Sequence, residues 1–359
     1  MKKKYQLLMK MAMLFISSLS FAAFGQQKPF EIKLLKPIYQ QRELKASLQL
    51  KNTLASQRKF IAENNLKIKV ANTAVSEMEL KTITGDAEIS SAQAEELKVA
   101  QLNKQFSPAY LEIIKQLKFA CISTNKFYDA RNQKLVPAIR LQKCGNCWAY
   151  SAVGPLECSY IRVNKIADPT TIDLSEKQIV ACSGGGDCTG GLAYQAFNWL
   201  KTTHTKMQKE TNAPDNGTSA PCPATPPTNV QLIDWGVIDP SGDINKIAPV
   251  DKIKEALCKY GPVACSMMAT PLFQNFAGDG TFFEFTSNYA APSSNHAVMI
   301  IGWDDTRQAW LVRNSWSTTW ADDGYCWIKY NSNNIGRRAA WILANKNRLI
   351  FQPKKIKLP

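Results

Sequence analysis

The chain has 359 residues, and 45% of them are apolar, which is enough for a large core and two or three folding units. Its formal net charge of +15 suggests a nucleic-acid-binding protein until the charge is divided along the chain. Residues 126–345 contribute only +1, whereas residues 1–25, 26–125 and 346–359 contribute +4, +5 and +5. The charge distribution therefore gives no support for a nucleic-acid-binding surface in the central region.

The first 25 residues are typical of a secretory signal peptide. Four lysines within the first ten residues precede an apolar stretch at 11–16 and a small-residue exit that ends at Gly25. The apolar stretch is short and is followed by serines, which argues against a stable membrane anchor. No cysteine follows it, which argues against a lipoprotein anchor. We therefore expect cleavage near Gly25 and a secreted or periplasmic protein.

Residues 26–125 differ in character from the rest of the chain. They are rich in Lys, Glu, Gln and Ala, contain no tryptophan, and have a single cysteine, Cys121. Their composition predicts helices at about 39–71 and 91–118. We expect a separate helical region here, ahead of the main domain.

Residues 126–345 carry the pattern of a mixed helix and strand domain. The part from about 140 to 235 reads as mainly helical, with an exposed loop at 212–227 that is rich in Pro, Thr, Ser and Asn. The part from about 236 to 345 reads as strand-rich, because short apolar runs alternate with turn residues. The expected strands are at 262–267, 296–302, 309–313 and 325–330.

Three short motifs of this domain carry reactive side chains: residues 144–148 (CGNCW), 295–297 (NHA) and 314–316 (NSW). A thiol becomes a strong nucleophile when an adjacent imidazolium stabilises its thiolate. Residues 147–153 contain neither Gly nor Pro and predict the start of a buried helix. Its dipole would lower the pKa of Cys147 further.

Histidine is scarce, since the chain has only His204 and His296. His204 lies in the polar stretch 201–206 and reads as a solvated loop residue. His296 opens the predicted strand at 296–302, and Asn314 directly follows the predicted strand at 309–313. By position alone, His296 would be read as a structural residue and Asn314 as a turn residue.

The three motifs resemble those of papain-like cysteine proteases, over roughly residues 127–345. The resemblance implies an α+β fold with a helical left domain, an antiparallel β-barrel-like right domain and an active-site cleft between them. It implies that Cys147 is the nucleophile and His296 the general acid/base, and that Asn314 orients the imidazole. Trp316 would shield the contact between Asn314 and His296 from water.

The oxyanion-hole residue departs from the family pattern. The family's glutamine lies six residues before the nucleophile, whereas Gln142 lies five before Cys147. A one-residue deletion would still allow Gln142 to stabilise the oxyanion together with the backbone N–H of Cys147. Ser317 and Ala321 stand where the family usually has glycines, so the loop after Trp316 is expected to differ in shape.

The resemblance also implies where a substrate binds. Gly190 and Gly191 resemble the glycine-rich loop along which an extended peptide lies. Ala193, Ala297 and Ala340 would wall the pocket for the residue two before the scissile bond. Their small apolar side chains predict a preference for apolar or aromatic residues there, whereas residues 337–338 (Arg-Arg) would instead bias the far end toward acidic ones.

Ten cysteines, one of them the nucleophile, are typical of an oxidising compartment. Two disulfides are implied by the resemblance, and a third is an open possibility across the turn at 261–262. A zinc site is disfavoured, because the chain has only two histidines and no repeated Cys-x2-Cys pair. We expect no metal and no cofactor. The implied pairs are Cys144–Cys188 and Cys182–Cys222, the open pair is Cys258–Cys265, and Cys158 and Cys326 are expected to be buried thiols.

The spacing of Asn64, Ile68 and Asn72 resembles the end of the family's propeptide helix motif. Residues 26–125 are therefore expected to inhibit the domain in cis, the alternative being a helical spacer. The expected protein is a monomer that acts on peptide or protein substrates. Two other functions stay open: a catalytically inactive binding module, and a peptide acyl transferase or ligase that uses the same thioester.

Overall fold

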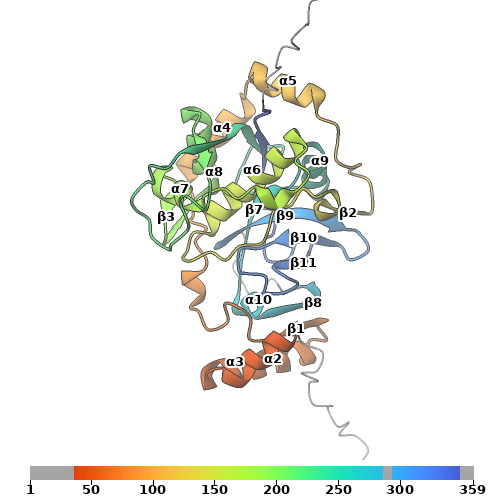
Figure 1. Ribbon diagram of the computed structural model, residues 1–359. Helices are drawn as coiled ribbons and strands as arrows, with labels where there is room; N and C mark the ends of the chain where they lie inside the picture. The colour runs from red at the N-terminus through yellow and green to blue at the C-terminus, as the bar shows by residue number, and fades with distance from the viewer. Residues whose placement is uncertain (1–35, 286–292, 348–359) are drawn as a thin grey trace, which may run out of the picture.

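The computed structural model describes residues 36–285 and 293–347. The predicted signal peptide at 1–25 and nearly all of the basic tail at 346–359 lie outside the described residues. The described chain confirms the expected α+β architecture, with a helical half and a strand-rich half (Figure 1).

The helical half is built around α6 (Cys147–Asn164), which packs against α7 (Glu176–Cys182) and α8 (Ala193–Thr203). Every residue of α6 except Asn164 is buried. A helix that is covered on all sides must be apolar around its circumference, as the sequence of α6 largely is. The helix also contacts β9 (His296–Asp304) and β12 (Arg337–Ala344), so it joins the two halves.

The strand-rich half is one long, mainly antiparallel sheet. Its strands follow the order β1-β8-β11-β10-β9-β7-β12-β6-β5, with β2 paired to β9. Its end strands do not pair with each other in the described residues, so the sheet is open rather than a closed barrel. The expected strands are confirmed as β7, β9, β10 and β11. The remaining bounds are β1 (Ile68–Val70), β2 (Phe127–Asp129), β5 (Lys206–Gln208), β6 (Pro227–Val237), β7 (Val263–Met267), β8 (Phe276–Phe282), β10 (Ala309–Arg313) and β11 (Tyr325–Lys329).

The N-terminal region has more and shorter helices than its composition predicts. The expected helix at 39–71 is two helices, α2 (Pro37–Lys45) and α3 (Leu48–Glu63), because Ser47 caps the second by accepting from the N–H of Leu50. The chain then turns into β1. The expected helix at 91–118 is likewise divided into α4 (Ser91–Leu102) and α5 (Pro108–Gln116), since Pro108 cannot continue a preceding helix.

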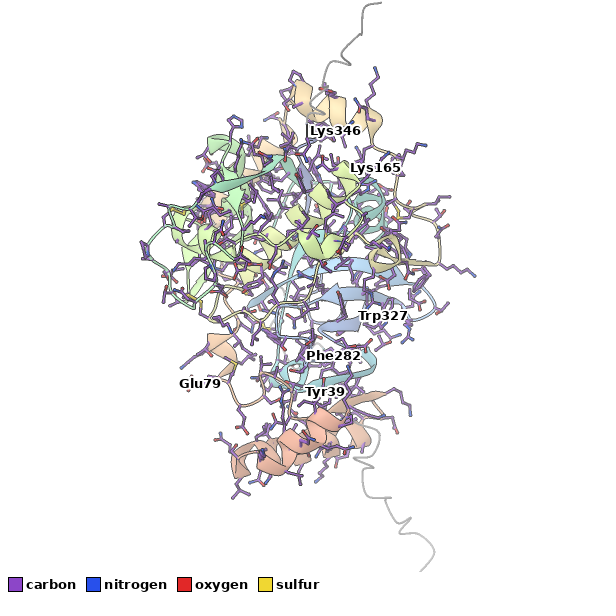
Figure 2. All side chains as sticks on the ribbon, viewed as in Figure 1. Tyr39, Glu79, Lys165, Phe282, Trp327 and Lys346 are labelled. Carbon is purple, nitrogen blue, oxygen red and sulfur yellow. A yellow bond between two sulfur atoms is a disulfide. The ribbon has the colours of Figure 1, made fainter. Side chains whose placement is uncertain are left out.

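This N-terminal region spans the length of the molecule. Helices α2 and α3 lie at one end and α5 lies at the other (Figure 1). At the first end, β1 pairs with β8, and the hydroxyl of Tyr39 donates to the carbonyl of Ala321 at 2.9 Å. Figure 2 shows Tyr39 and Phe282 at this junction, and both are fully buried. The region is therefore packed onto the domain rather than separate from it.

Three disulfides connect the described chain. The structure pairs Cys144 with Cys188 and Cys182 with Cys222, as the resemblance implies. Cys258, at the end of α9 (Val250–Tyr260), pairs with Cys121, so the considered bridge to Cys265 is wrong. Cys265 instead is a buried free thiol within β7, as Cys158 and Cys326 are elsewhere.

No helix among residues 36–285 and 293–347 is long and apolar enough to cross a lipid bilayer. Within the same residues, no cluster of three or more His, Cys, Asp or Glu side chains is arranged to hold a metal ion.

Candidate active site

Cys147 is the first residue of α6 and is fully buried. Its Sγ accepts hydrogen bonds from the N–H of Gly85 at 3.2 Å and from the N–H of Ala297 at 3.4 Å. Burial, and then the nearby carboxylate of Asp86, raise the pKa of the thiol to about 12, against the lowering effect of the backbone donors. In this state of the chain the sulfur is therefore a neutral thiol.

His296 and Asn314 are held together by two neighbouring strands. His296 opens β9 and Asn314 directly follows β10, which pairs with β9. The Nε2 atom of His296 lies 2.8 Å from Oδ1 of Asn314, and the imidazole stacks on Trp316 with 4.5 Å between ring centroids. Burial lowers the pKa of His296 to about 4, although the bond to Asn314 opposes this shift. The imidazole is therefore neutral here.

The second ring nitrogen of His296, Nδ1, differs from Nε2 in its hydrogen bonding. His296 is fully buried, and its Nδ1 has no hydrogen-bond partner within the described chain. A buried polar atom without a partner is costly, so such an atom is expected to have a functional role. Because Nε2 is engaged by Asn314, Nδ1 is the nitrogen left to exchange a proton.

Gln142 is buried beside the same group of residues. Its Oε1 accepts from the hydroxyl of Ser315 at 2.6 Å, which fixes the direction of the side-chain amide. Its Nε2 donates to the carbonyl of Ile83 at 3.1 Å and to that of Cys144 at 2.7 Å. The indole N–H of Trp316 donates to the same Ile83 carbonyl at 3.2 Å. A carbonyl of the N-terminal region therefore occupies the donors of Gln142 and Trp316.

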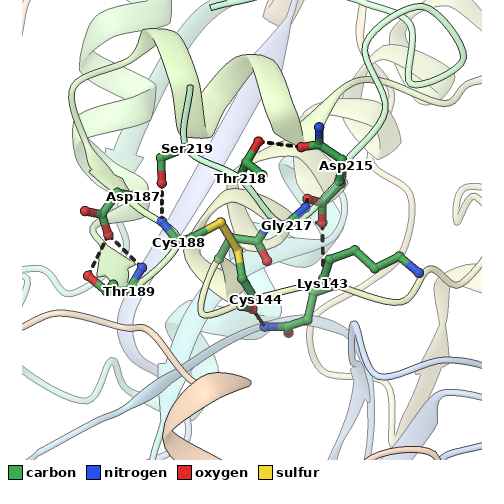
Figure 3. Close-up of a disulfide and its surroundings, with 12 residues drawn as sticks. Lys143, Cys144, Asp187, Cys188, Thr189, Asp215, Gly217, Thr218 and Ser219 are labelled. Atoms are coloured by element: carbon green, nitrogen blue, oxygen red, sulfur yellow. Dashed lines mark hydrogen bonds between the residues drawn. A yellow bond between two sulfur atoms is a disulfide. The ribbon is translucent and has the colours of Figure 1, made fainter. Parts of the chain in front are cut away.

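The loop before α6 is held by a disulfide and by an aspartate. Figure 3 shows Cys144 bonded to Cys188, with the backbone N–H of Lys143 donating to the carboxylate of Asp215 at 3.2 Å. The same carboxylate accepts from the side chain of Asn146 at 3.0 Å and from the hydroxyl of Tyr150 at 2.8 Å. The side chain of Asn146, directly before Cys147, thus has a partner that positions the loop.

Asp215 is a positioning residue that the sequence interpretation missed. It lies in the polar loop at 212–227, where nothing in the local composition distinguishes it. Two residues of the loop after Trp316 have positive φ values. Ser317 and Ala321 have φ values of 76° and 47°, the left-handed region that favours glycine. Both residues therefore have a backbone conformation that glycine adopts most easily.

Residues 83–88 of the N-terminal region pass through this site. The N–H of Gly191 donates to the carbonyl of Gly85 at 2.8 Å, and the N–H of Ala87 donates to the carbonyl of Gly191 at 3.0 Å. A Cβ on Gly85 would lie 1.8 Å from the carbonyl oxygen of Gly145, so only glycine fits there. Gly85 was missed from sequence, although it is the only glycine among residues 26–125.

The predicted substrate-binding residues separate into three places. Gly190 and Gly191 form β4, and Gly191 pairs with the passing segment. Ala193 and Ala340 line one small cavity. Ala297 is not among the residues that line it, and its contact with the site is the backbone N–H that reaches Cys147.

Comparison with known proteins agrees with this geometry. The model of the papain family of cysteine proteases matches residues 124–343. The chain is 31% identical over 215 residues to human cathepsin O, covering 58% of this chain and 62% of that one. It is 30% identical over 223 residues to cathepsin L of Sarcophaga peregrina, covering 60% and 62%. The match thus spans about three fifths of the length of these curated relatives.

Solved structures resemble a larger share of the chain. Procathepsin L 3 from the larval midgut of Tenebrio molitor has a TM-score of 0.58 and 21% identity, and the match covers 88% of this chain and 94% of that one. The recombinant precursor of stem bromelain has a TM-score of 0.60 and 20% identity, with coverage of 86% and 93%. At such identities the likeness establishes the fold. The match of the family model over residues 124–343, more than half of the chain, shows that the chain belongs to the papain family of cysteine proteases.

Proposed function

We propose that the protein is a secreted cysteine endopeptidase that acts on peptide or protein substrates as a monomer and is made as an inactive precursor. The observation that carries this proposal is the arrangement of three side chains. Cys147 stands at the start of α6, and His296 on the facing strand is held at Nε2 by Asn314 while Nδ1 has no partner in the described chain. Such a set is suited to thiol chemistry.

In the proposed reaction, the proton of the Cys147 thiol passes to Nδ1 of His296, and the thiolate attacks the substrate's carbonyl carbon. The C–N bond then breaks as the imidazolium donates its proton to the leaving amine, which leaves a thioester on Cys147. A water molecule gives a proton to His296 and attacks the thioester carbon. The C–S bond then breaks, the acyl group leaves as a carboxylic acid, and the imidazolium returns its proton to the sulfur of Cys147. Asn314 orients the ring through both steps.

Each tetrahedral intermediate carries an oxyanion that needs donors. The side-chain amide of Gln142 is held in direction by Ser315, and the backbone N–H of Cys147 lies at the start of a helix. Both are fixed before reaction, and fixed donors stabilise developing charge without reorganisation. We assign them to the oxyanion hole.

The precursor's inhibition follows from what the N-terminal region places at the sulfur. The group that faces Sγ of Cys147 is the N–H of Gly85, not a carbonyl carbon, so no acyl transfer can start. The carbonyl of Ile83 occupies the amide of Gln142. Burial keeps the pKa of the thiol high and that of His296 low, so the reactive ion pair does not form. Likeness to proenzyme structures over most of the chain supports the same role.

The proposal is tested by labelling the protein with an epoxysuccinyl inhibitor, which alkylates activated thiols. The full chain is opened by limited proteolysis, and the labelled residue is mapped by mass spectrometry. We expect stoichiometric label on Cys147 and hydrolysis of a quenched peptide library. A protein that binds peptides but neither takes up label nor cleaves them would be an inactive binding module. Products joined to an added amine in place of hydrolysis would indicate acyl transfer.

A further inference from the structure

A small cavity beside the active site contains an arginine whose partners all come from the inhibitory segment. Ala193 and Ala340 supply apolar walls, Ser266 lines it as well, and Arg338 closes one side. The side chain of Arg338 is only 5% exposed. An ionised side chain this deeply buried requires a partner of opposite charge.

The present partner of Arg338 is an aspartate of the passing segment. Nη1 of Arg338 lies 2.9 Å from Oδ2 of Asp86, and the hydroxyl of Ser294 donates to the same oxygen at 2.5 Å. The carboxylate of Asp86 is itself nearly fully buried. Asp86 lines the cavity together with Arg338, and about 10 Å³ of space for a water-sized molecule remains beside it.

The other contacts of the Arg338 guanidinium also belong to the segment. Nη2 donates to the carboxylate of Glu88 at 3.0 Å, Nη1 donates to the carbonyl of Ala87, and Nε has no partner within the described chain. The domain itself holds only the backbone of Arg338, whose N–H donates to Ile244 at 3.1 Å. Removal of the segment therefore removes every side-chain acceptor that the structure describes for this guanidinium.

The neighbouring arginine is different, and this difference defines the site. Arg337 pairs with Glu88 of the segment at 3.1 Å as well. In addition it donates to the backbone carbonyl and the side-chain oxygen of Asn245 at 3.2 and 3.1 Å, and to the hydroxyl of Ser294 at 2.7 Å. Those groups belong to the domain and remain when the segment leaves. Arg337 is thus a fixed cation that orients Ser294, and Arg338 is the cation without a domain partner.

We propose, on the basis of the proposed peptidase function, that this cavity selects an acidic residue two positions before the scissile bond, with Arg338 as the specificity-determining residue. A substrate that pairs with Gly191 presents a side chain at the level that Asp86 occupies now. An aspartate there accepts from Arg338 and Ser294 as Asp86 does. Glutamate is accommodated less well because the free space is small, and leucine or phenylalanine leaves the guanidinium unpaired.

The test compares peptides that differ at one position. The full chain is opened by limited proteolysis, and active sites are counted by labelling of Cys147. Quenched peptides carry Asp, Asn, Glu, Gln, Leu or Phe two residues before the cleaved bond. We expect kcat/KM for Asp to exceed that for its isostere Asn by about tenfold or more, as a charge-assisted bond to a buried cation would give.

Two variants of the arginine make the test specific. Arg338→Ala should remove the preference for Asp over Asn and leave cleavage of the Leu peptide within about threefold. Arg338→Lys keeps the charge without the planar fork and should retain part of the preference. Arg307→Ala, which removes an exposed arginine on the turn between β9 and β10, should change nothing. If Arg338→Ala does not fold, the comparison of Asp with Asn in the parent protein decides alone.

Failure of this inference is distinguishable from failure of the peptidase proposal. Full labelling of Cys147 with cleavage of Leu or Phe peptides at least as fast as Asp peptides overturns the specificity and leaves the peptidase intact. Absence of both labelling and cleavage overturns the two together.

Discussion

The backbone N–H of Gly85 points at the sulfur of Cys147 across 3.2 Å, at the place where a substrate's carbonyl carbon would have to lie. The contact joins residues 62 positions apart in the chain, and it ties the proposed inhibition to one backbone atom. It also depends on a glycine, since a Cβ at residue 85 would collide with the carbonyl oxygen of Gly145. One methyl group added at residue 85 therefore tests whether this segment inhibits the enzyme.

Gly85→Ala should free the active site of the uncleaved chain. The added Cβ would lie 1.8 Å from a backbone oxygen that cannot move without displacing the disulfide loop at Cys144, so the segment must lift from the site. We expect the labelling rate of Cys147 in the uncleaved chain to rise by about tenfold or more, as the population of open molecules increases. Lys81→Ala, at an exposed position of the same segment, is the control. Equal labelling rates in Gly85→Ala and the parent would contradict the proposed seating of the segment.

Cys147→Ala should abolish peptide hydrolysis while the fold is retained, because the change removes one sulfur atom at a helix start. Loss of the label and unchanged thermal unfolding would together support the assignment. Cys326→Ala, which removes a different buried thiol, should keep both the label and the activity. Turnover that survives in Cys147→Ala, with label on Cys158 or Cys326, would exclude Cys147 as the nucleophile.

Gln142→Ala tests the shifted oxyanion-hole residue. If the amide of Gln142 donates to the oxyanion, its loss should lower kcat by roughly 10²–10³, as removal of one such donor does elsewhere. Cys147 should still be labelled, since the thiol is unchanged. The measurement is kcat and KM on a fixed peptide after active-site counting. A fall of less than about threefold would mean that the backbone N–H of Cys147 acts without this side chain.

The residues of the site that could be predicted from sequence are those that adjoin a recognisable run of apolar residues. Cys147 begins an apolar run that forms α6, and His296 and Asn314 adjoin short apolar runs that form β9 and β10. Periodicity and turn residues are enough to identify such elements. Their meeting in space was implied by the family resemblance, not by the pattern.

The parts that were missed depend on contacts between distant segments. Cys121 and Cys258 are separated by 137 residues, and no spacing rule distinguishes that pair from Cys258 and Cys265. The course of residues 83–88 through the site depends on a surface formed by the rest of the chain. The helix ends at Lys45 and Leu102 were missed for a different reason, because polar helix-forming residues continue past the caps.

Glu210→Gln should change how stability depends on pH. Burial, and then the carboxylates of Asp173 and Asp215, raise the pKa of Glu210 to about 7 in the folded chain, against the backbone N–H of Asp215. Between the ordinary pKa of a glutamate and about 7, the unfolded chain has released a proton that the folded chain retains. Stability therefore falls as pH rises through this interval, and the contribution is complete below it.

The variant removes that fall, because glutamine does not titrate and its oxygen can still accept from Asp215. In the Cys147→Ala background, thermal midpoints at pH 4.5, 6 and 7.5 should show the variant gaining on its parent as pH rises. Glu79→Gln, at an exposed position, should follow the parent. A difference in thermal midpoint between the variant and its parent that is the same at all three pH values would contradict the raised pKa of Glu210.

Because of the disulfide between Cys121 and Cys258, the position at which the precursor is cut decides whether the N-terminal segment can leave the domain. Cys121 lies in the N-terminal region, whereas Cys258 is on α9 of the peptidase domain, and the N–H of Ala120 also donates to the carbonyl of Cys258 at 2.8 Å. A cut at about residue 125 leaves the inhibitory segment covalently attached. A cut between α4 and α5, at 103–107, releases the segment that crosses the active site. We therefore expect that productive cleavage lies before Cys121.

This expectation can be checked with a specific protease site introduced after Asn125 in the full chain. After cutting, the protein should run as one species without reductant and as two with it, and Cys147 should remain poorly labelled because the tethered segment stays at a high local concentration. The double variant Cys121→Ala, Cys258→Ala should separate into two species without reductant and label faster. Separation of the cut parent without reductant would show that the disulfide does not hold the segment to the domain.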